Sequence, residues 1–335
     1  MKHPHSGSLR IFLSSCCVLA LLVSVARGQS QDKQDKKDDD VIVCNLGGLS
    51  VFPVTVTDKD DHPITTLTLD AFTIFEDKVR HPLVFWQNCA KTDCPMSVAI
   101  LLDLSKSLRV NLLADEVRNR LVRFAKEAGA EEYALLGFRD QIEMLTGWTK
   151  TSEALADTLN RPTKVGGYTA LYDAVAVTVE WLNKRQSSRH ALIVISDGWD
   201  TASHRSLEQV EEVLKHSNVT LYSLTIGKGP TALDDPFAEA HWNVLRRLAA
   251  PSAGRFFLTR SAKDVGEAFD RIADELRHQY LIGYYPINTK HDGKWRHIKV
   301  RVTPSASKDP SDPNKPAKQV ELKVRAREGY YPTTP

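Results

Sequence analysis

The sequence predicts an α/β protein: a doubly wound, mostly parallel sheet inserted into a small β-sandwich that the two flanks of the chain form together. Between residues 95 and 278, short apolar runs alternate with helical patterns, as strand–helix units of a parallel sheet do. Two runs, 97–102 and 191–195, are continuously apolar, which is typical of strands buried on both faces. The flanks, 41–90 and 279–332, contain only short β-like runs, so we expect strands there.

The first 40 residues are expected to lie outside the folded body. A basic start precedes an apolar run over 11–26, and Ala26-Arg27-Gly28 has small residues where a signal peptidase cuts. We therefore expect 1–28 to be a cleaved export signal, since so short an apolar run barely spans a bilayer as an anchor. Residues 29–40 are charged and without apolar side chains, which predicts a disordered tether. The mature protein is thus expected in the periplasm, outside the cell or at its surface, without a transmembrane segment.

Charge and cysteine content narrow the class of protein further. The net charge falls from +2 to about −1 when the three basic residues of the signal are removed. A near-neutral chain without a basic stripe has no electrostatic reason to bind nucleic acid. Three cysteines remain, Cys44, Cys89 and Cys94, so at most one internal disulfide forms. The close spacing favours Cys89–Cys94, and a pair between Cys44 and either of them stays open.

The apolar pattern places the elements in order. The first flank is expected to form strands at 51–57, 72–76 and 83–86. In the middle part, apolar and β-branched runs predict strands at 97–102, 133–138, 141–145, 191–195, 220–226 and 255–258. Helical spacing predicts helices at 112–128, 152–159, 170–184, 206–216, 242–249 and 262–277.

The last flank repeats the character of the first. Strands are expected at 280–285, 296–302 and 319–325, with a loop rich in Pro, Ser and Lys over 303–318. Asp292-Gly293 suits a hairpin turn. Because neither flank has enough strands for independent stability, we expect the two to pair into one sandwich.

Oxygen-bearing side chains follow the two buried strands. The string Asp103-Leu-Ser105-Lys-Ser107 comes directly after the first, and Ser196-Asp197-Gly198 after the second. A third loop, Gly166-Gly167-Tyr168-Thr169, precedes a helix. Ligands of open α/β sheets bind at the carboxyl ends of the strands, so the three loops are expected to form one metal site. Its expected ligands are Asp103, Ser105, Ser107, Thr169 and Asp197.

The donor set indicates which ion binds and what the ion can do. Carboxylate and hydroxyl oxygens suit Mg²⁺ or Mn²⁺ and disfavour copper or zinc. Because hydroxyl ligands are neutral, the ion stays electron-poor and can accept a carboxylate from outside. We expect Asp173 and Asp200 to stay outside the ligand set, with Asp173 on a helix surface. Trp199 is expected to pack on a neighbouring helix, and the alternative is an exposed contact with a partner. Tyr330 and Tyr331 are expected at the sandwich edge.

The order DxSxS, GGYT and SDG resembles the von Willebrand factor type A domain and its metal-ion-dependent adhesion site. The resemblance implies that the serines coordinate the ion directly, the aspartates directly or through water, and that a partner carboxylate completes the shell. Most of positions 41–332 resembles bacterial exported VWFA-related proteins, for example in ISDGWDTAS and IADELRHQYLIGYYP. One departure is Lys106-Ser107-Leu108, where such domains often carry Gly-Ser-Met, so Lys106 puts a positive charge beside the site.

The leading interpretation is a metal-dependent binding module, not an enzyme, whose partner is a protein or peptide that presents Asp or Glu. No GxSxG elbow, Walker A string or HExxH motif occurs in the sequence. One alternative is a metal-assisted hydrolase, because bound Mg²⁺ can polarise a phosphoryl or carbonyl oxygen. Another is a structural domain whose site stays empty.

Overall fold

The computed structural model describes most of the chain after its first 47 residues. The described ranges are 48–105, 115–161, 164, 166–225, 237–290, 292–303 and 321–332. The predicted signal and tether, Cys44, Ser107 and nearly all of the loop 303–318 lie outside them. Within these ranges, no helix is both long enough and apolar enough to cross a bilayer. The domain bounds 41–90, 95–278 and 279–332 stay predictions.

A six-stranded sheet forms the centre of the α/β part, in the order β10-β9-β8-β5-β6-β7. Its strands are β5 (Met96–Asp103), β6 (Glu132–Phe138), β7 (Ile142–Thr149), β8 (Arg189–Ile195), β9 (Val219–Leu224) and β10 (Arg255–Phe257). All neighbours pair in parallel except β7, which is antiparallel to β6. Every residue of β5 is buried. The predicted, mostly parallel sheet is therefore confirmed.

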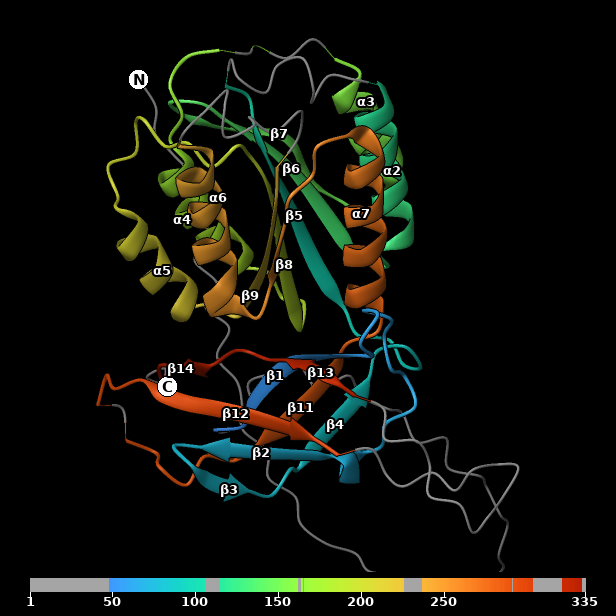
Figure 1. Cartoon of the computed structure of the whole chain (residues 1–335), viewed down its shortest axis with the longest axis vertical. Coiled ribbons are helices and arrows are strands. Elements are labelled where there is room, and N and C mark those ends of the chain that lie inside the picture. Colours follow the sequence, from blue (N-terminus) through green and yellow to red (C-terminus); the bar gives the residue numbers. More distant parts are fainter. Residues whose placement is uncertain are drawn as a thin grey trace, which may run out of the picture. The chain divides into compact units, whose positions relative to one another are not determined.

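Helices cover both faces of this sheet (Figure 1). One face carries α2 (Asp115–Glu127), α3 (Ser152–Leu159) and α7 (Ala262–Arg277). The other carries α4 (Leu171–Leu182), α5 (Leu207–Lys215) and α6 (Ala238–Ala249). Each helix turns an apolar stripe toward the sheet, so two separate apolar cores form. The sequence placed the start of α6 too late, at residue 242, because its first turn is mostly polar or exposed.

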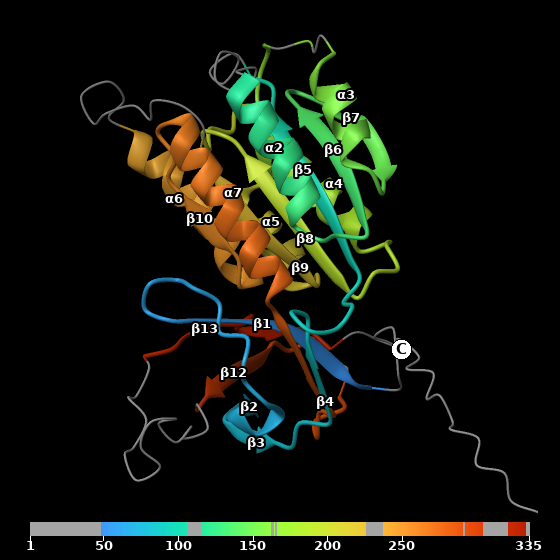
Figure 2. The same ribbon diagram turned by 90° about the vertical axis from the view of Figure 1, so that its right-hand side faces the viewer.

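The two flanks pair with each other, as predicted. One sheet has the order β13-β1-β11-β4 and the other β14-β12-β2-β3. The strands of the first flank are β1 (Ser50–Thr57), β2 (Phe72–Glu76), β3 (Val79–His81) and β4 (Phe85–Asn88). Those of the last flank are β11 (Tyr280–Tyr284), β12 (Arg296–Val302), β13 (Lys323–Arg325) and β14 (Gly329–Tyr330). Figure 2 shows β2 and β3 beside each other, with β1 between them and the helices.

Aromatic side chains from both flanks fill the core of the sandwich. Phe52 and Phe72 come from the first flank, and Tyr280 and Tyr284 from the last. The rings of Phe72 and Tyr280 lie 5.0 Å apart, and the Tyr284 hydroxyl donates to the buried carboxylate of Glu76 at 2.5 Å. Neither flank alone supplies this core, which is why the two halves fold together.

The structure adds two short strands to the predicted ones and places Tyr330 and Tyr331 at or next to the sandwich edge. The sequence did not predict β3 and β14, because two or three residues are too few to show an alternating pattern. Tyr330 lies in the edge strand β14, as expected. Tyr331, directly after β14, packs on Trp295 next to β12 and also stacks on His216 at the end of α5, with ring centroids 4.0 Å apart.

The predicted disulfide is confirmed. Cys89 and Cys94 are bonded, directly after β4 and before β5. The bond thus closes a short loop at the point where the chain passes from the sandwich into the α/β part. The Arg189 guanidinium donates to the carbonyl oxygen of Cys94 at 2.7 Å and to that of Leu276 at 2.6 Å, which ties this crossing to the end of α7.

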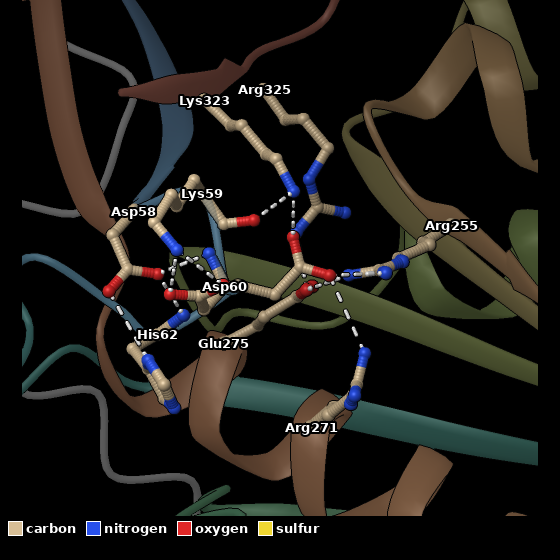
Figure 3. Close-up of polar contacts among 10 residues, drawn as sticks. Asp58, Lys59, Asp60, His62, Arg255, Arg271, Glu275, Lys323 and Arg325 are labelled. Carbon is tan, nitrogen blue, oxygen red and sulfur yellow. Dashed lines mark hydrogen bonds and ion pairs between the residues drawn. The ribbon is translucent and has the colours of Figure 1, made fainter. Parts of the chain in front are cut away.

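A cluster of charges joins the α/β part to the sandwich (Figure 3). Asp61, in the turn after β1, accepts from Arg255 of β10 at 2.7 Å and from Lys323 of β13 at 2.9 Å. Glu275 of α7 lies 2.5 Å from the Arg325 guanidinium and 3.4 Å from that of Arg255. Arg255 therefore bridges two carboxylates, and each carboxylate also contacts a cation on β13.

We expect the contribution of Asp61 to stability to disappear in acid. Burial acts to raise the pKa of this carboxyl group, but the hydrogen bonds from Lys323 and Arg255 outweigh burial and lower the pKa from 3.8 to about 2. A lowered pKa means that the ionised carboxylate stabilises the folded state at all pH values above 3.8, and that this gain is lost as the pH falls through about 2.

Urea unfolding of the wild type and of Asp61→Asn from pH 7 to pH 2 tests this. The difference in free energy of unfolding should be constant near neutral pH and shrink below pH 3.8. Asp60→Asn, which changes the exposed neighbouring carboxylate, is the control. A wild-type advantage over Asp61→Asn that does not change with pH would contradict the assignment.

Candidate metal centre

Two of the predicted site residues, Asp103 and Asp197, lie where two neighbouring strands end. β5 and β8 pair in parallel with Leu102 opposite Ile195, so the residues that follow, Asp103 and Ser196, come side by side. Asp103 is completely buried, with 0% of its surface exposed. The register of the two buried strands, not a local turn, therefore brings the first and third loops of the predicted site together.

Both oxygens of the Asp103 carboxylate are held in place. The backbone N–H of Ser105 donates to Oδ1 at 2.9 Å, and the Ser196 hydroxyl donates to Oδ2 at 2.7 Å. The Ser105 side chain also bonds to this carboxylate, so the whole group is fixed in one orientation. Ser105 is buried beside it. Ser107, the remaining residue of this motif, lies outside the described residues.

The loop that carries Thr169 is fastened to both of the other loops. Gly166 donates its N–H to the carbonyl oxygen of Leu104 at 2.9 Å. The Thr169 N–H donates to the Thr201 hydroxyl at 2.9 Å, and the Thr169 carbonyl accepts from Thr201 and Ala202 at 2.8 and 3.0 Å. The backbone of Thr169, a buried residue, is thereby fixed against the third loop.

Asp197 occupies a loop that requires glycine at the next position. Gly198 has a φ of +88°, and a Cβ at this position would lie 2.3 Å from the carbonyl oxygen of His241 in α6. The N–H of Trp199 donates to Asp197 Oδ1 at 3.1 Å, which orients the carboxylate. The loop is therefore shaped by its close approach to the backbone of α6.

The two carboxylates of the site repel each other. Burial first, and then the charge of Asp197, raises the pKa of Asp103 to about 6, while hydrogen bonds from Ser196 and Ser105 act in the opposite direction. A pKa raised this far shows that Asp103 carries its negative charge at a cost in the folded protein. A cation between the two carboxylates would remove that cost.

Asp200 and Asp173 support the site from outside. Asp200 accepts from the Tyr172 N–H at 3.3 Å and from the Ser203 hydroxyl at 2.6 Å. Asp173 accepts from the His204 N–H at 2.8 Å and pairs with Arg205 at 3.1 Å. Both thus tie the third loop to the start of α4. Asp173 lies in the first turn of α4 and is partly exposed, in line with its expected place on the helix surface, and its ion pair joins that surface to the third loop.

Sequence reasoning missed two positioning residues, Ser196 and Thr201. Ser196 belongs to the motif Ser196-Asp197-Gly198, but the sequence predicted no role for it. The signal for Ser196 was available, because it directly follows the apolar run 191–195, as Asp103 directly follows the run 97–102. The signal for Thr201 was not, since its bond to Thr169 joins loops that are 32 residues apart.

The donors that the loops present fit a hard divalent ion. Asp103, Ser105, Thr169 and Asp197 offer only oxygen, and magnesium and manganese prefer such ligands. Over the described ranges, no group of three or more His, Cys, Asp or Glu side chains could hold a metal instead. A hydroxyl-rich site at the end of β5 is therefore the candidate metal centre of this part of the chain.

The chain is similar to a known protein family in sequence and to solved proteins in structure. Residues 98–199 match a family model, the von Willebrand factor type A domain. No curated protein matches the chain. The PilB minor pilin from Streptococcus sanguinis is 10% identical with a TM-score of 0.45, over 56% of this chain and 62% of the pilin.

Two further solved structures are similar at the same level. Proximal thread matrix protein 1 from the mussel byssus, with a zinc-occupied MIDAS motif, is 16% identical with a TM-score of 0.47, over 60% of this chain and 49% of that protein. The vWF domain of the pilus tip protein Mfa5 from Porphyromonas gingivalis is 14% identical with a TM-score of 0.44, over 54% and 95%. The chain thus spans less than two thirds of the pilin and of the mussel protein, and at these identities the likeness concerns the fold.

Proposed function

Because the chain carries a von Willebrand factor type A domain over residues 98–199, we propose that it is an exported binding module that grips a partner protein through a divalent metal ion. Asp103, Ser105, Ser107, Thr169 and Asp197 would hold Mg²⁺ or Mn²⁺. An Asp or Glu of the partner would complete the coordination of the ion. The protein would act in the periplasm, outside the cell or at its surface.

The single observation that carries this proposal is the convergence of three loops on the buried Asp103. Its carboxylate is oriented by Ser105 and Ser196, and the loop of Thr169 is bonded to the loops on either side of it. Burying a carboxylate beside a second one is unfavourable unless a cation compensates the charge. The arrangement therefore supports a function in which a bound cation compensates the buried charge, such as binding a metal.

The composition of the site supports binding over catalysis. Three of the five proposed ligands are neutral hydroxyls, so an ion held there keeps most of its positive charge and attracts an external carboxylate. The Ser196 hydroxyl donates to Asp103 at 2.7 Å, but Ser196 is completely buried. A nucleophile must reach an external substrate, so this contact orients the carboxylate and does not prepare Ser196 for attack.

We expect purified protein to bind Mg²⁺ saturably, and Thr169→Ala to weaken the binding at least tenfold, because it removes one oxygen ligand from a site that has few. Isothermal titration calorimetry with Mg²⁺, Mn²⁺ and Zn²⁺ in turn measures this and ranks the ions. Asp60→Asn, an exposed carboxylate in the β1–β2 loop, is the control and should bind as the wild type does.

Three outcomes would contradict the proposal. Equal heats of Mg²⁺ binding for wild type and Thr169→Ala would show that the ion does not bind at this site. Metal-dependent turnover in an esterase, phosphatase and peptidase panel, lost in Thr169→Ala, would favour a hydrolase. Thermal stability that neither EDTA nor added metal changes would leave a structural domain with an empty site.

A further inference from the structure

Exposed aromatic side chains lie on two loops of the candidate metal centre and at the start of α6. Among the described residues of the α/β part, four large apolar side chains are exposed: Met144, Tyr168, Trp199 and Phe237. Three of the four are aromatic, with exposed fractions of 70% for Tyr168, 50% for Trp199 and 65% for Phe237. Aromatic side chains are enriched at binding surfaces, so their position relative to the proposed ligands decides whether they form one.

Two of these side chains are next to proposed ligands in the chain. Tyr168 immediately precedes Thr169, whose backbone is fixed by Thr201 on both sides of the residue. The backbone N–H of Trp199 donates to the carboxylate of Asp197 at 3.1 Å. Each ring is therefore attached to a segment of backbone whose position is set by the site itself.

The third side chain reaches the site through α6. The Trp199 ring packs on the ring of His241, with centroids 4.6 Å apart, which confirms the expected packing against a neighbouring helix. Phe237 lies one turn before His241, and the His241 N–H donates to the Phe237 carbonyl at 3.1 Å. The start of α6 and the loop of Asp197 thus present Phe237 and Trp199 on adjoining surfaces.

The packing of Trp199 does not bury it. Half of its surface stays exposed although it contacts His241, and Phe237 is exposed further still. Folding gains little from apolar surface that remains in water, at roughly 25 cal/mol for each Å². Binding of a partner that covers these rings would gain the free energy of burying that surface.

We propose that Tyr168, Trp199 and Phe237, here named the aromatic rim, bind the side chain next to the partner's acidic residue. The partner is then a peptide segment in which Asp or Glu stands beside a bulky apolar or aromatic residue. This rests on the proposed function, because the metal must first hold the acidic residue. Phe237 offers no hydrogen bond, which suits an apolar side chain better than the hydroxyl groups of a sugar.

The test uses synthetic fluorescent peptides of identical length with a central Glu, flanked on each side either by Phe or Leu or by Gly or Ser. Fluorescence polarisation with the full chain in Mg²⁺ should give affinities about tenfold higher for the apolar flanks, since a side chain of this size buried at a hot spot contributes that much or more. Trp199→Ala and Phe237→Ala should reduce the preference to threefold or less. Both variants should keep the Mg²⁺ affinity of the wild type, and Met144→Ala, an exposed apolar residue in β7, should keep the preference.

The outcomes separate the two proposals. If no peptide binds in a Mg²⁺-dependent manner, the proposed function fails, and the rim fails with it. If the Glu peptides bind with Mg²⁺ but show no preference for apolar flanks, or if the preference survives in Trp199→Ala and Phe237→Ala, only the rim is overturned. Tighter Mg²⁺-dependent binding of an acidic oligosaccharide than of any peptide would also overturn it.

Discussion

Asp103→Asn is expected to stabilise the metal-free protein and to abolish its stabilisation by Mg²⁺. In the metal-free state this buried carboxylate is repelled by Asp197, and burial and that charge raise its pKa to about 6. An amide of nearly the same shape removes the charge, with an expected gain of about 1 to 2 kcal/mol at pH 7.5. It can still accept from the Ser105 N–H.

With excess Mg²⁺ the order of stabilities is expected to reverse, so that the wild type becomes more stable than Asp103→Asn. At a Mg²⁺ concentration 100 times the dissociation constant, the wild type should gain about 3 kcal/mol from binding. Asp103→Asn should gain little, because an amide oxygen does not supply the negative charge that the ion requires. Urea unfolding of both proteins with EDTA and with excess Mg²⁺ gives the four free energies, and Asp60→Asn serves as control. Equal Mg²⁺-induced gains in wild type and Asp103→Asn would remove Asp103 from the metal centre.

Arg325→Met is expected to destabilise the protein by about 3 kcal/mol, because it leaves the buried carboxylate of Glu275 without its nearest cation. Only 2% of the Glu275 side chain is exposed, and its oxygen lies 2.5 Å from Arg325 but 3.4 Å from Arg255. Arg255 is shared with Asp61, so it can replace the lost partner only in part. The expected effect is therefore at the lower end for a broken buried ion pair.

The double variant Arg325→Met with Glu275→Met separates the lost ion pair from lost packing. With both charges gone, no uncompensated charge stays buried, and most of the lost stability should return. Lys323→Met, which removes a half-exposed partner of Asp61 from the same strand, is the control and should cost less than about 1 kcal/mol. A double variant as unstable as Arg325→Met alone would mean that the guanidinium acts through packing and not through its charge.

The central sheet, and the strand ends at which two of the proposed ligands stand, could be predicted because their signals are local. The two continuous apolar runs that became β5 and β8 are buried from end to end. In a parallel sheet such runs end at the same edge, so Asp103 and Asp197 had to lie near each other once both strands were assigned. The pairing of the flanks followed from a count of strands. Predictions failed where the local pattern is weak, as in β3, β14 and the first turn of α6.

What joins the parts of the molecule could not be read from the sequence. Asp61 and Arg255 are 194 residues apart, yet they form one of the closest ion pairs of the junction. The Arg327 guanidinium donates to the carbonyl oxygens of Lys215 and Ser217 at the end of α5, at 2.8 and 2.7 Å. Charged residues such as these have the same local pattern as solvated surface residues. Only the register of distant strands decides which of them meet a partner.

The amino-acid sequence alone thus determined which residues are buried in strands, and therefore which polar side chains stand at the strand ends, because burial imposes a periodic pattern on neighbouring residues. The tertiary structure alone decided which side chain orients Asp103, which cation faces Glu275 and which aromatic rings stay exposed beside the site. Those choices depend on contacts between segments far apart in the chain, and no periodicity within a segment records them.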